Sequence, residues 1–188
     1  MTCPGFTGDI LMLIRRAILK DTAAIARVRI DTWRTAYRGI VPDEFLDNMS
    51  YEGNESRWAE RLSDVDNQVY TFVAVDESGQ IVGFISGGPN RDNDPVYKGE
   101  LHAIYILPSH HGRGIGRRLT VALVEKMLEM GIDTMLLWVF TDNPARRFYE
   151  ALGGQLIKSS QFELGQANID EVAYGWLDIR TLLKEQNR

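Results

Sequence analysis

Two hydrophobic periods along this chain separate predicted helices from predicted strands. Apolar residues recur every three or four positions where helices are expected, as where Ile30, Trp33 and Tyr37 share one face. Helices are predicted over residues 21–37, 42–48, 52–62, 114–130 and 143–152, with a short one after Asp178. Shorter apolar runs predict strands over residues 13–18, 69–75, 81–86, 101–107, 135–140, 155–164 and 169–176.

Residues with special backbone preferences support these boundaries. Asp21 is the expected cap of the first helix, Pro42 suits the first turn of the second, and Gly153 ends the last long one. Residues 77–80 predict a hairpin turn, whereas the segment 87–99 is rich in Gly, Pro, Asn and Asp and predicts a loop. The resulting order predicts a mixed α/β sandwich with one parallel crossover in its middle.

Composition narrows the class of protein. The 188 residues fit one domain, expected over residues 12–188, with residues 1–11 as a leader or disordered start. The net charge of −5 argues against a nucleic-acid partner; it suits a cationic substrate, and it is equally the ordinary balance of a globular protein. No apolar run is long enough to span a membrane, so no membrane partner is expected. The single cysteine, Cys3, excludes an intrachain disulfide and fits a cytoplasmic location.

The most informative segment is a glycine loop, residues 111–116, between the predicted strand 101–107 and the helix that follows it. Gly112, Gly114 and Gly116 let the backbone approach a ligand closely, and a helix start offers unpaired N–H groups. A pyrophosphate site and a tight structural turn both fit this pattern. The P-loop and the dinucleotide fingerprint do not fit, because Gly-Lys-Ser/Thr and Gly-x-Gly-x-x-Gly are both absent.

Two motifs resemble those of the GCN5-related N-acetyltransferase (GNAT) family. The glycine loop, His-Gly-Arg-Gly-Ile-Gly, is similar to that family's Gln/Arg-x-x-Gly-x-Gly/Ala, with His111 at the first position. Residues 143–154 resemble its Asn-x-x-Ala-x-x-Phe-Tyr-x-x-x-Gly-Phe, with Gly154 where Phe is common. The resemblance covers roughly residues 13–176. It implies an α/β acyl-CoA N-acyltransferase fold, with a central, mixed but mostly antiparallel twisted sheet of about seven strands flanked by helices.

The resemblance also implies acetyl-CoA as the donor, with no metal. Backbone groups of the glycine loop would hold the pyrophosphate, and the strand before it would pair with the pantetheine arm. In the family this central strand carries a bulge and splays from the next strand, which admits the thioester. The implied donor-binding residues are Ile106, Leu107, Gly112, Arg113, Gly114, Ile115, Gly116, Arg117, Asn143 and Tyr149.

The implied chemistry is attack of a neutral amine on the thioester. Tyr149 is the expected acid that protonates the leaving thiolate, and Glu100 is the candidate base. A packed core tyrosine and a solvated strand-end glutamate are the alternatives. His102 lies two residues from Glu100 and is either a second base or a packed strand histidine. The adjacent His110 and His111 do not predict a metal site, because their side chains point apart.

The acceptor is expected to be the primary amine of a small molecule. Trp33 and Tyr37 lie where the family's first helices form the acceptor cleft, and they are either pocket residues or core residues of an amphipathic helix. The alternatives are a protein N-terminal or lysine acetyltransferase and a non-catalytic acyl-CoA-binding regulatory module. Dimers are common in the family, so a homodimer is compatible with the resemblance.

Overall fold

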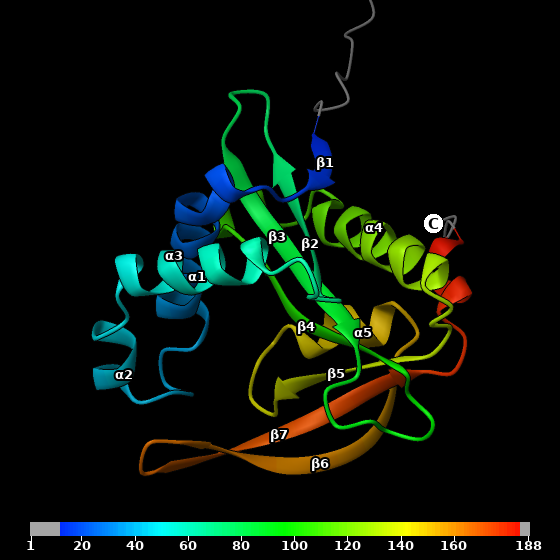
Figure 1. Ribbon diagram of the computed structural model, residues 1–188. Helices are drawn as coiled ribbons and strands as arrows, with labels where there is room; N and C mark the ends of the chain where they lie inside the picture. Colours follow the sequence, from blue (N-terminus) through cyan, green and yellow to red (C-terminus); the bar gives the residue numbers. More distant parts are fainter. Residues whose placement is uncertain (1–11, 185–188) are drawn as a thin grey trace, which may run out of the picture.

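The structure, a computed structural model, describes residues 12–184 and is built around one twisted sheet (Figure 1). The strand order is β1-β2-β3-β4-β5-β7-β6, and every neighbouring pair is antiparallel except β4 and β5. The strands are β1 (Leu13–Arg16), β2 (Tyr70–Val75), β3 (Ile81–Pro89), β4 (Gly99–Ile106), β5 (Met135–Phe140), β6 (Gln155–Leu164) and β7 (Ala167–Trp176). The predicted seven-stranded, mostly antiparallel sheet is confirmed. The expected leader, residues 1–11, lies outside the described residues.

Helices connect the strands and cover both faces of the sheet. They are α1 (Thr22–Ala36), α2 (Asp43–Asp47), α3 (Tyr51–Ser63), α4 (Ile115–Glu129) and α5 (Arg146–Ala151), with 3₁₀ turns η1 (Leu19–Asp21), η2 (Pro108–His110) and η3 (Ile179–Leu183). The parallel strands β4 and β5 are joined by α4, the crossover that such a pair requires. Within residues 12–184, no helix is long and apolar enough to cross a membrane.

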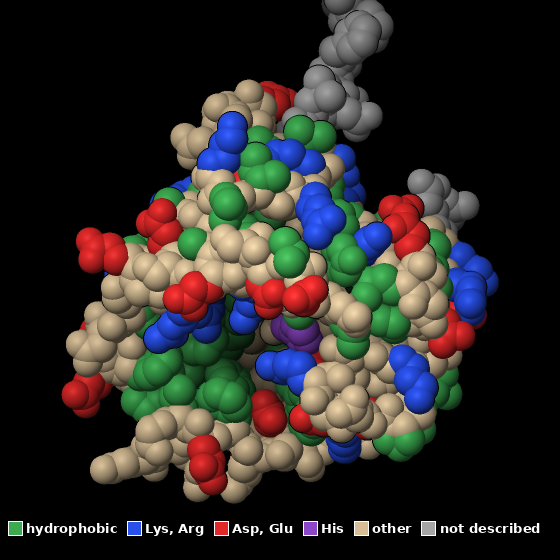
Figure 2. All heavy atoms as spheres, viewed as in Figure 1, with side chains coloured by type: hydrophobic (Ala, Val, Ile, Leu, Met, Phe, Trp, Pro, Cys, Tyr) green, Lys and Arg blue, Asp and Glu red, His purple; other side chains and the backbone are tan. Residues whose placement is uncertain are grey.

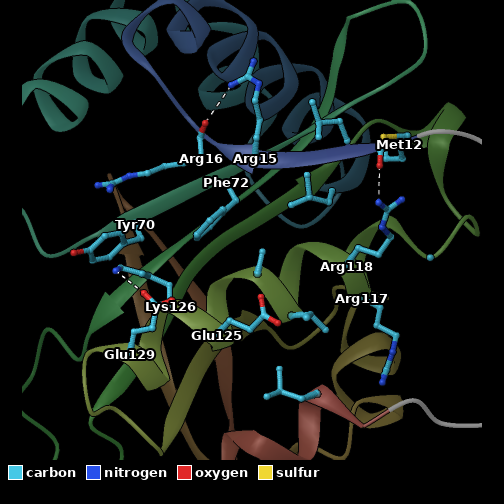
Figure 3. A pocket seen from close by; sticks show the side chains of 16 residues that line it. Met12, Arg15, Arg16, Tyr70, Phe72, Arg117, Arg118, Glu125, Lys126 and Glu129 are labelled. Carbon is cyan, nitrogen blue, oxygen red and sulfur yellow. Dashed lines mark hydrogen bonds and ion pairs between the residues drawn. The ribbon is translucent and has the colours of Figure 1, made fainter.

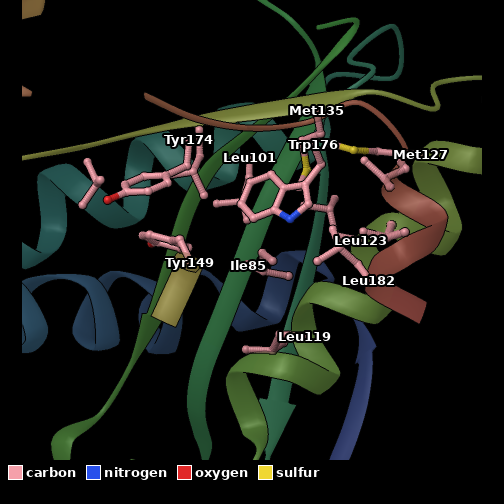
Figure 4. Close-up of a cluster of buried hydrophobic side chains, with 14 of the residues drawn as sticks. Ile85, Leu101, Leu119, Leu123, Met127, Met135, Tyr149, Tyr174, Trp176 and Leu182 are labelled. Carbon is pink, nitrogen blue, oxygen red and sulfur yellow. The ribbon is translucent and has the colours of Figure 1, made fainter. Parts of the chain in front are cut away.

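The core lies in layers on opposite faces of the sheet. Because successive side chains of a strand alternate between faces, Phe84 and Ile85 on β3 enter different clusters. Phe84 packs beside Trp58 of α3, on the face that α1 and α3 cover. Ile85 belongs to the cluster that contains Leu119 and Leu123 of α4, which also takes in β5 and β7 (Figure 4).

One expectation about a segment boundary was wrong. The strand β3 continues to Pro89, so residues 87–89 belong to the sheet and not to a loop. Their glycines reflect crowding: a Cβ on Gly87 would lie 2.6 Å from the carbonyl oxygen of Glu100, and one on Gly88 would lie 2.5 Å from that of Gln68. At the C-terminal end, the short helix predicted after Asp178 is confirmed, as the 3₁₀ helix η3.

Asp21 occupies the N-cap position of α1, as the sequence predicted, but its side chain does not bond to the start of that helix. Its carboxylate accepts hydrogen bonds from Arg15, at 2.6 and 3.0 Å, and from the backbone N–H of Ile18, at 2.9 Å. No side-chain cap bond is present at this helix start. The side chain therefore ties β1 to the turn before α1, a pairing across five intervening residues that helix periodicity does not reveal.

Candidate functional site

The strands β4 and β5 separate in the middle of the sheet. Within the described residues, they pair only through residues 99–101 and 135–137. The register between β3 and β4 shifts so that Ser86 faces Ala103 and Gly87 faces Leu101, which leaves His102 as the extra residue of a β-bulge. A bulge bends its strand, so β4 leaves β5 while it still pairs with β3. The second half of β4 thus keeps a backbone edge that β5 does not use.

Two residues on this edge have groups to offer a ligand. Both backbone groups of Leu107 are already bonded, because its N–H donates to Val82 and its carbonyl accepts from His110. Since a strand's backbone groups alternate in direction, those of Ile104 and Ile106 point away from β3. The carbonyl oxygen of Ile106 lies 2.8 Å from Nε2 of His111. The backbone groups of Ile104 and the N–H of Ile106 remain for a partner strand or an extended ligand.

The glycine loop turns the chain into α4 through two left-handed residues. Gly112 has φ 73° and Gly114, the N-cap of α4, has φ 72°, a region that non-glycine residues rarely adopt. A Cβ on either would meet nothing within 4 Å, so open space lies beside both. The first N–H that bonds back to Gly114 is that of Arg118, so the N–H groups before it lack intrahelical partners. The turn offers an oxyanion several donors and the positive end of a helix dipole.

The other residues of the loop contribute their backbones. Ile115 is buried in the core, and a Cβ on Gly116 would lie 3.0 Å from Cζ of Phe148. Gly116 is therefore required by the packing of α4 against α5. The three arginines around the loop each donate to a carbonyl oxygen, namely Arg113 to Ser109, Arg117 to Lys184 and Arg118 to Met12. They add positive charge near the helix start while their side chains are held in place.

A separate groove of about 960 Å³ lies beside this helix, between α4 and the strands β1 and β2 (Figure 3). It reaches the glycine loop at Gly114 and ends among Tyr70, Lys126 and Glu129. Lys126 pairs with Glu129 at 2.8 Å and lies over the ring of Tyr70. Neither of the predicted catalytic residues, Tyr149 and Glu100, lines this groove, so the groove is not the expected reaction centre.

Tyr149 is buried beside the splay, on α5. Its ring packs against Phe148 and Tyr174, with centroids 5.4 and 6.3 Å away. Burial, with a smaller effect of Tyr105, raises the pKa of Tyr149, so the phenol keeps its proton at neutral pH. A protonated tyrosine can act as a hydrogen-bond donor or as an acid, but not as a base.

Asn143 and two further tyrosines meet near this point. Burial is the main cause that raises the pKa of Tyr37, and the Tyr37 hydroxyl interacts with the side chains of Tyr105 and Asn143. Asn143 is buried, and its Oδ1 accepts from the N–H of Ala145 at 2.8 Å. Counted back from Ala145, the second motif places its asparagine at position 142, which is Asp142 here, so Asn143 stands one position out of register. Tyr105 was missed by the sequence analysis, because only the fold brings β4 beside α1.

Trp33 extends this aromatic group on α1. Its ring lies 4.6 Å from that of Tyr37 and 6.4 Å from that of Tyr105. The indole Nε1 is buried and has no hydrogen-bond partner among the described residues. The structure brings the two predicted acceptor residues together, on the face of β4 that carries Tyr105.

Glu100 is buried at the start of β4, so the alternative of a solvated strand-end glutamate was wrong. Its carboxylate accepts hydrogen bonds from the backbone N–H and the guanidinium of Arg91. Burial raises the pKa of Glu100, but the hydrogen bonds from Arg91 outweigh it and hold the pKa below its usual range. Glu100 is therefore ionised at neutral pH and is held by a counter-ion.

His102, the bulge residue, lies next to this ion pair. Its Nε2 is 3.9 Å from the Glu100 carboxylate, and burial lowers the pKa of His102 to about 4. The imidazole is thus neutral at physiological pH. Its Nε2 is buried without a hydrogen-bond partner in the part of the chain that the structure describes. No set of three His, Cys, Asp or Glu side chains within residues 12–184 is arranged to hold a metal ion.

Comparisons with known proteins agree on one family. Residues 29–154 match the family model described as "Acetyltransferase (GNAT) family". The chain is 37% identical over 179 residues to the uncharacterized N-acetyltransferase YuaI of Bacillus subtilis. The aligned region covers 95% of this chain and 100% of YuaI. It is 28% identical over 107 residues to an L-methionine sulfoximine/L-methionine sulfone acetyltransferase of Salmonella typhimurium, over 51% of this chain and 63% of that one.

A similar fold is found among solved structures. The PaiA N-acetyltransferase of Thermoplasma acidophilum, solved in complex with coenzyme A, has a TM-score of 0.68 and 21% identity. That likeness covers 85% of this chain and 97% of the other. YncA of Salmonella typhimurium, solved with acetyl-CoA, has a TM-score of 0.65 and 22% identity over 94% of this chain and 96% of its own.

Proposed function

The chain belongs to the acetyltransferase (GNAT) family and is an acetyl-CoA-dependent acyltransferase, and from that premise we propose that its acceptor is the primary amine of a small molecule. The observation that carries this proposal is the splay of β4 from β5, with Tyr149 buried on α5. Figure 2 shows a hollow on one face of the molecule, with hydrophobic, Lys or Arg, Asp or Glu, and His side chains around it. Two relatives are named for small acceptors, as an L-methionine sulfoximine/L-methionine sulfone acetyltransferase and an L-amino acid N-acyltransferase.

In this proposal the donor lies along the free edge of β4. Its pyrophosphate accepts hydrogen bonds from the backbone N–H groups of residues 113–117. The pantetheine arm pairs with the backbone groups of Ile104 and the N–H of Ile106, as an added strand would. The free backbone edge and the left-handed glycines support this placement, because both leave backbone groups accessible.

The reaction is a direct transfer in a ternary complex. The amine nitrogen attacks the thioester carbon, so a C–N bond forms and the C–S bond breaks. Tyr149, which burial keeps protonated, donates its proton to the leaving thiolate sulfur. The proton of the amine passes, through a water molecule, to Glu100 with His102 beside it. Arg91 weakens Glu100 as a base, and burial weakens His102 in the same sense. Nε2 of His102, which has no hydrogen-bond partner within residues 12–184, supports a share for the imidazole.

Thermal denaturation tests the donor first. Acetyl-CoA at about a hundred times its Kd should stabilise the folded state by about 3 kcal/mol, which raises Tm by about 5–10 °C for a chain of this size. NAD is the control and should leave Tm unchanged. A panel of small primary amines, followed by release of free thiol, then tests the acceptor. Turnover only with a peptide N-terminus or lysine would move the function to proteins, and a Tm shift without any turnover would indicate a binding module.

A further inference from the structure

Three arginines from separate elements converge beside the proposed acceptor site. Arg29 lies on α1, Arg61 on α3, and Arg91 on the connection between β3 and β4. The guanidinium of Arg29 lies over the ring of Trp33 at 5.2 Å, and that of Arg61 lies over Trp58 at 4.8 Å. These stacked contacts hold two cationic groups on aromatic surfaces that continue to Phe84 and Tyr105 of the sheet.

Two of these three arginines lack a carboxylate partner among the described residues, whereas Arg91 has Glu100 and is also affected by the negative charges of Asp92 and Glu171. Arg91 pairs with Glu100, and Arg29 donates to the neutral amide of Asn54 at 2.5 Å. Neither Arg29 nor Arg61 forms an ion pair with a carboxylate of the described residues. Burial, followed by the positive charges of Arg29 and Arg91, lowers the pKa of Arg61. Arg61 is nevertheless exposed to solvent, so a ligand can reach its side chain.

Unused hydrogen-bonding groups lie on the same face. Thr32 and Trp33 follow Arg29 on α1 at spacings of three and four, which places all three on one side of the helix. Thr32 Oγ1, Trp33 Nε1 and His102 Nε2 are buried atoms without a hydrogen-bond partner within residues 12–184. The charges of Arg91 and Arg61 both act on His102, which places the imidazole beside the arginines. Buried polar atoms are rarely left unpaired, so the Thr32 hydroxyl and the Trp33 N–H point to a ligand that supplies acceptor oxygens.

We propose that the acceptor carries a carboxylate beside its amine, and that Arg61 and Arg29, with Arg91 next to them, bind this carboxylate. The acceptor class is therefore a free amino acid or a close analogue, which deepens the proposed function and rests on it. A planar guanidinium fork matches a carboxylate with two parallel hydrogen bonds.

The test compares acceptors that differ only in this charge. The L-amino acids and their carboxamides are assayed as matched pairs at saturating acetyl-CoA, with thiol release as the readout. For the best pair, the acid should have a kcat/KM about 10- to 100-fold above that of the amide, because hydrogen bonds to a charged group are lost with the carboxylate. Equal or faster turnover of the amide would overturn the proposal.

Variants assign the preference to Arg61. Arg61→Gln should lower kcat/KM for the acid by about tenfold or more and change that for the amide by less than about twofold. Arg57→Gln, on the exposed surface of the same helix, is the matched control and should leave both values unchanged. The assignment would be refuted if Arg61→Gln does not alter the ratio of kcat/KM for the acid to that for the amide. The acetyl-CoA-dependent rise in Tm shows that each variant is folded.

Failure of the proposed function gives a different result. If the amino acids, their amides and the panel of small primary amines all fail to release thiol while acetyl-CoA still raises Tm, acetylation of small amines is excluded. The arginine site is then judged by binding alone, with N-acetylated amino acids and their carboxamides titrated calorimetrically in the presence of coenzyme A. Tighter binding of the acids supports a carboxylate site, and equal or undetectable binding of both series overturns it.

Discussion

Gly154→Ala should destabilise the protein because the neighbours of this residue leave no room for a Cβ atom. The second motif of the family commonly has Phe at this position, and here the space is filled from β7. A Cβ on Gly154 would lie 2.7 Å from Cζ2 and 3.0 Å from Cη2 of Trp176, and 2.9 Å from the carbonyl oxygen of Tyr149. The ring cannot move away freely, because it is 4% exposed and its Nε1 donates to Leu152 at 3.0 Å (Figure 4).

The expected cost follows from these distances. Contacts under 3.0 Å with a fixed ring and a backbone oxygen require a shift of both, and overpacking of this kind costs about 1–3 kcal/mol. For a protein of this size each kcal/mol lowers Tm by about 2–4 °C, so a cost of about 2 kcal/mol lowers Tm by about 4–8 °C. Gly53→Ala on α3 is the matched control. Its Cβ would meet Ser50 at 3.5 Å, an ordinary contact, and alanine favours the helix by up to about 1 kcal/mol.

Thermal denaturation followed by circular dichroism measures both variants, and a double-mutant cycle identifies the cause. In Trp176→Phe the two indole atoms nearest Gly154 are absent, so Gly154→Ala should cost less in that background. The reasoning is refuted if Gly154→Ala melts within about 1 °C of the wild type, or if its cost is the same in both backgrounds.

Three further predictions concern the donor site, the acid and the bulge histidine. Gly114→Asp should abolish binding of acetyl-CoA measured by calorimetry, because it brings a side chain and a negative charge to a left-handed residue at the helix start; normal affinity in a folded variant would contradict the donor site. Tyr149→Phe should lower kcat while the acetyl-CoA-dependent rise in Tm stays intact, and unchanged kcat with chemistry rate-limiting would remove the acid role. Because burial lowers the pKa of His102 to about 4 from its ordinary 6.5, the unfolded chain binds more protons between these values, and the free energy of unfolding should rise with pH across that window. His102→Leu should reduce this slope in urea denaturation, and an equal slope would show that the histidine does not contribute.

Local patterns gave much of the fold correctly. The strands β5 and β6 begin and end where the apolar pattern predicted, because a short run of buried or alternating residues is a property of the segment itself. The glycine loop at Gly112 and Gly114 could likewise be recognised from the sequence, since a left-handed backbone at a helix start selects glycine locally. Gly116 has a different cause, the approach of Phe148, which a motif match alone does not distinguish.

The sequence by itself determined the family, the donor and the order of the elements, because these depend on short motifs and on hydrophobic periods. Only the tertiary structure decided how the candidate site is composed. It paired Glu100 with Arg91 and brought Arg29 and Arg61 together from two helices. It also placed His102 in a bulge, where Nε2 has no partner among the residues that the structure describes. The physical reason is that burial, charge balance and unmet hydrogen bonds arise between residues far apart in the chain, and no local pattern encodes such neighbours.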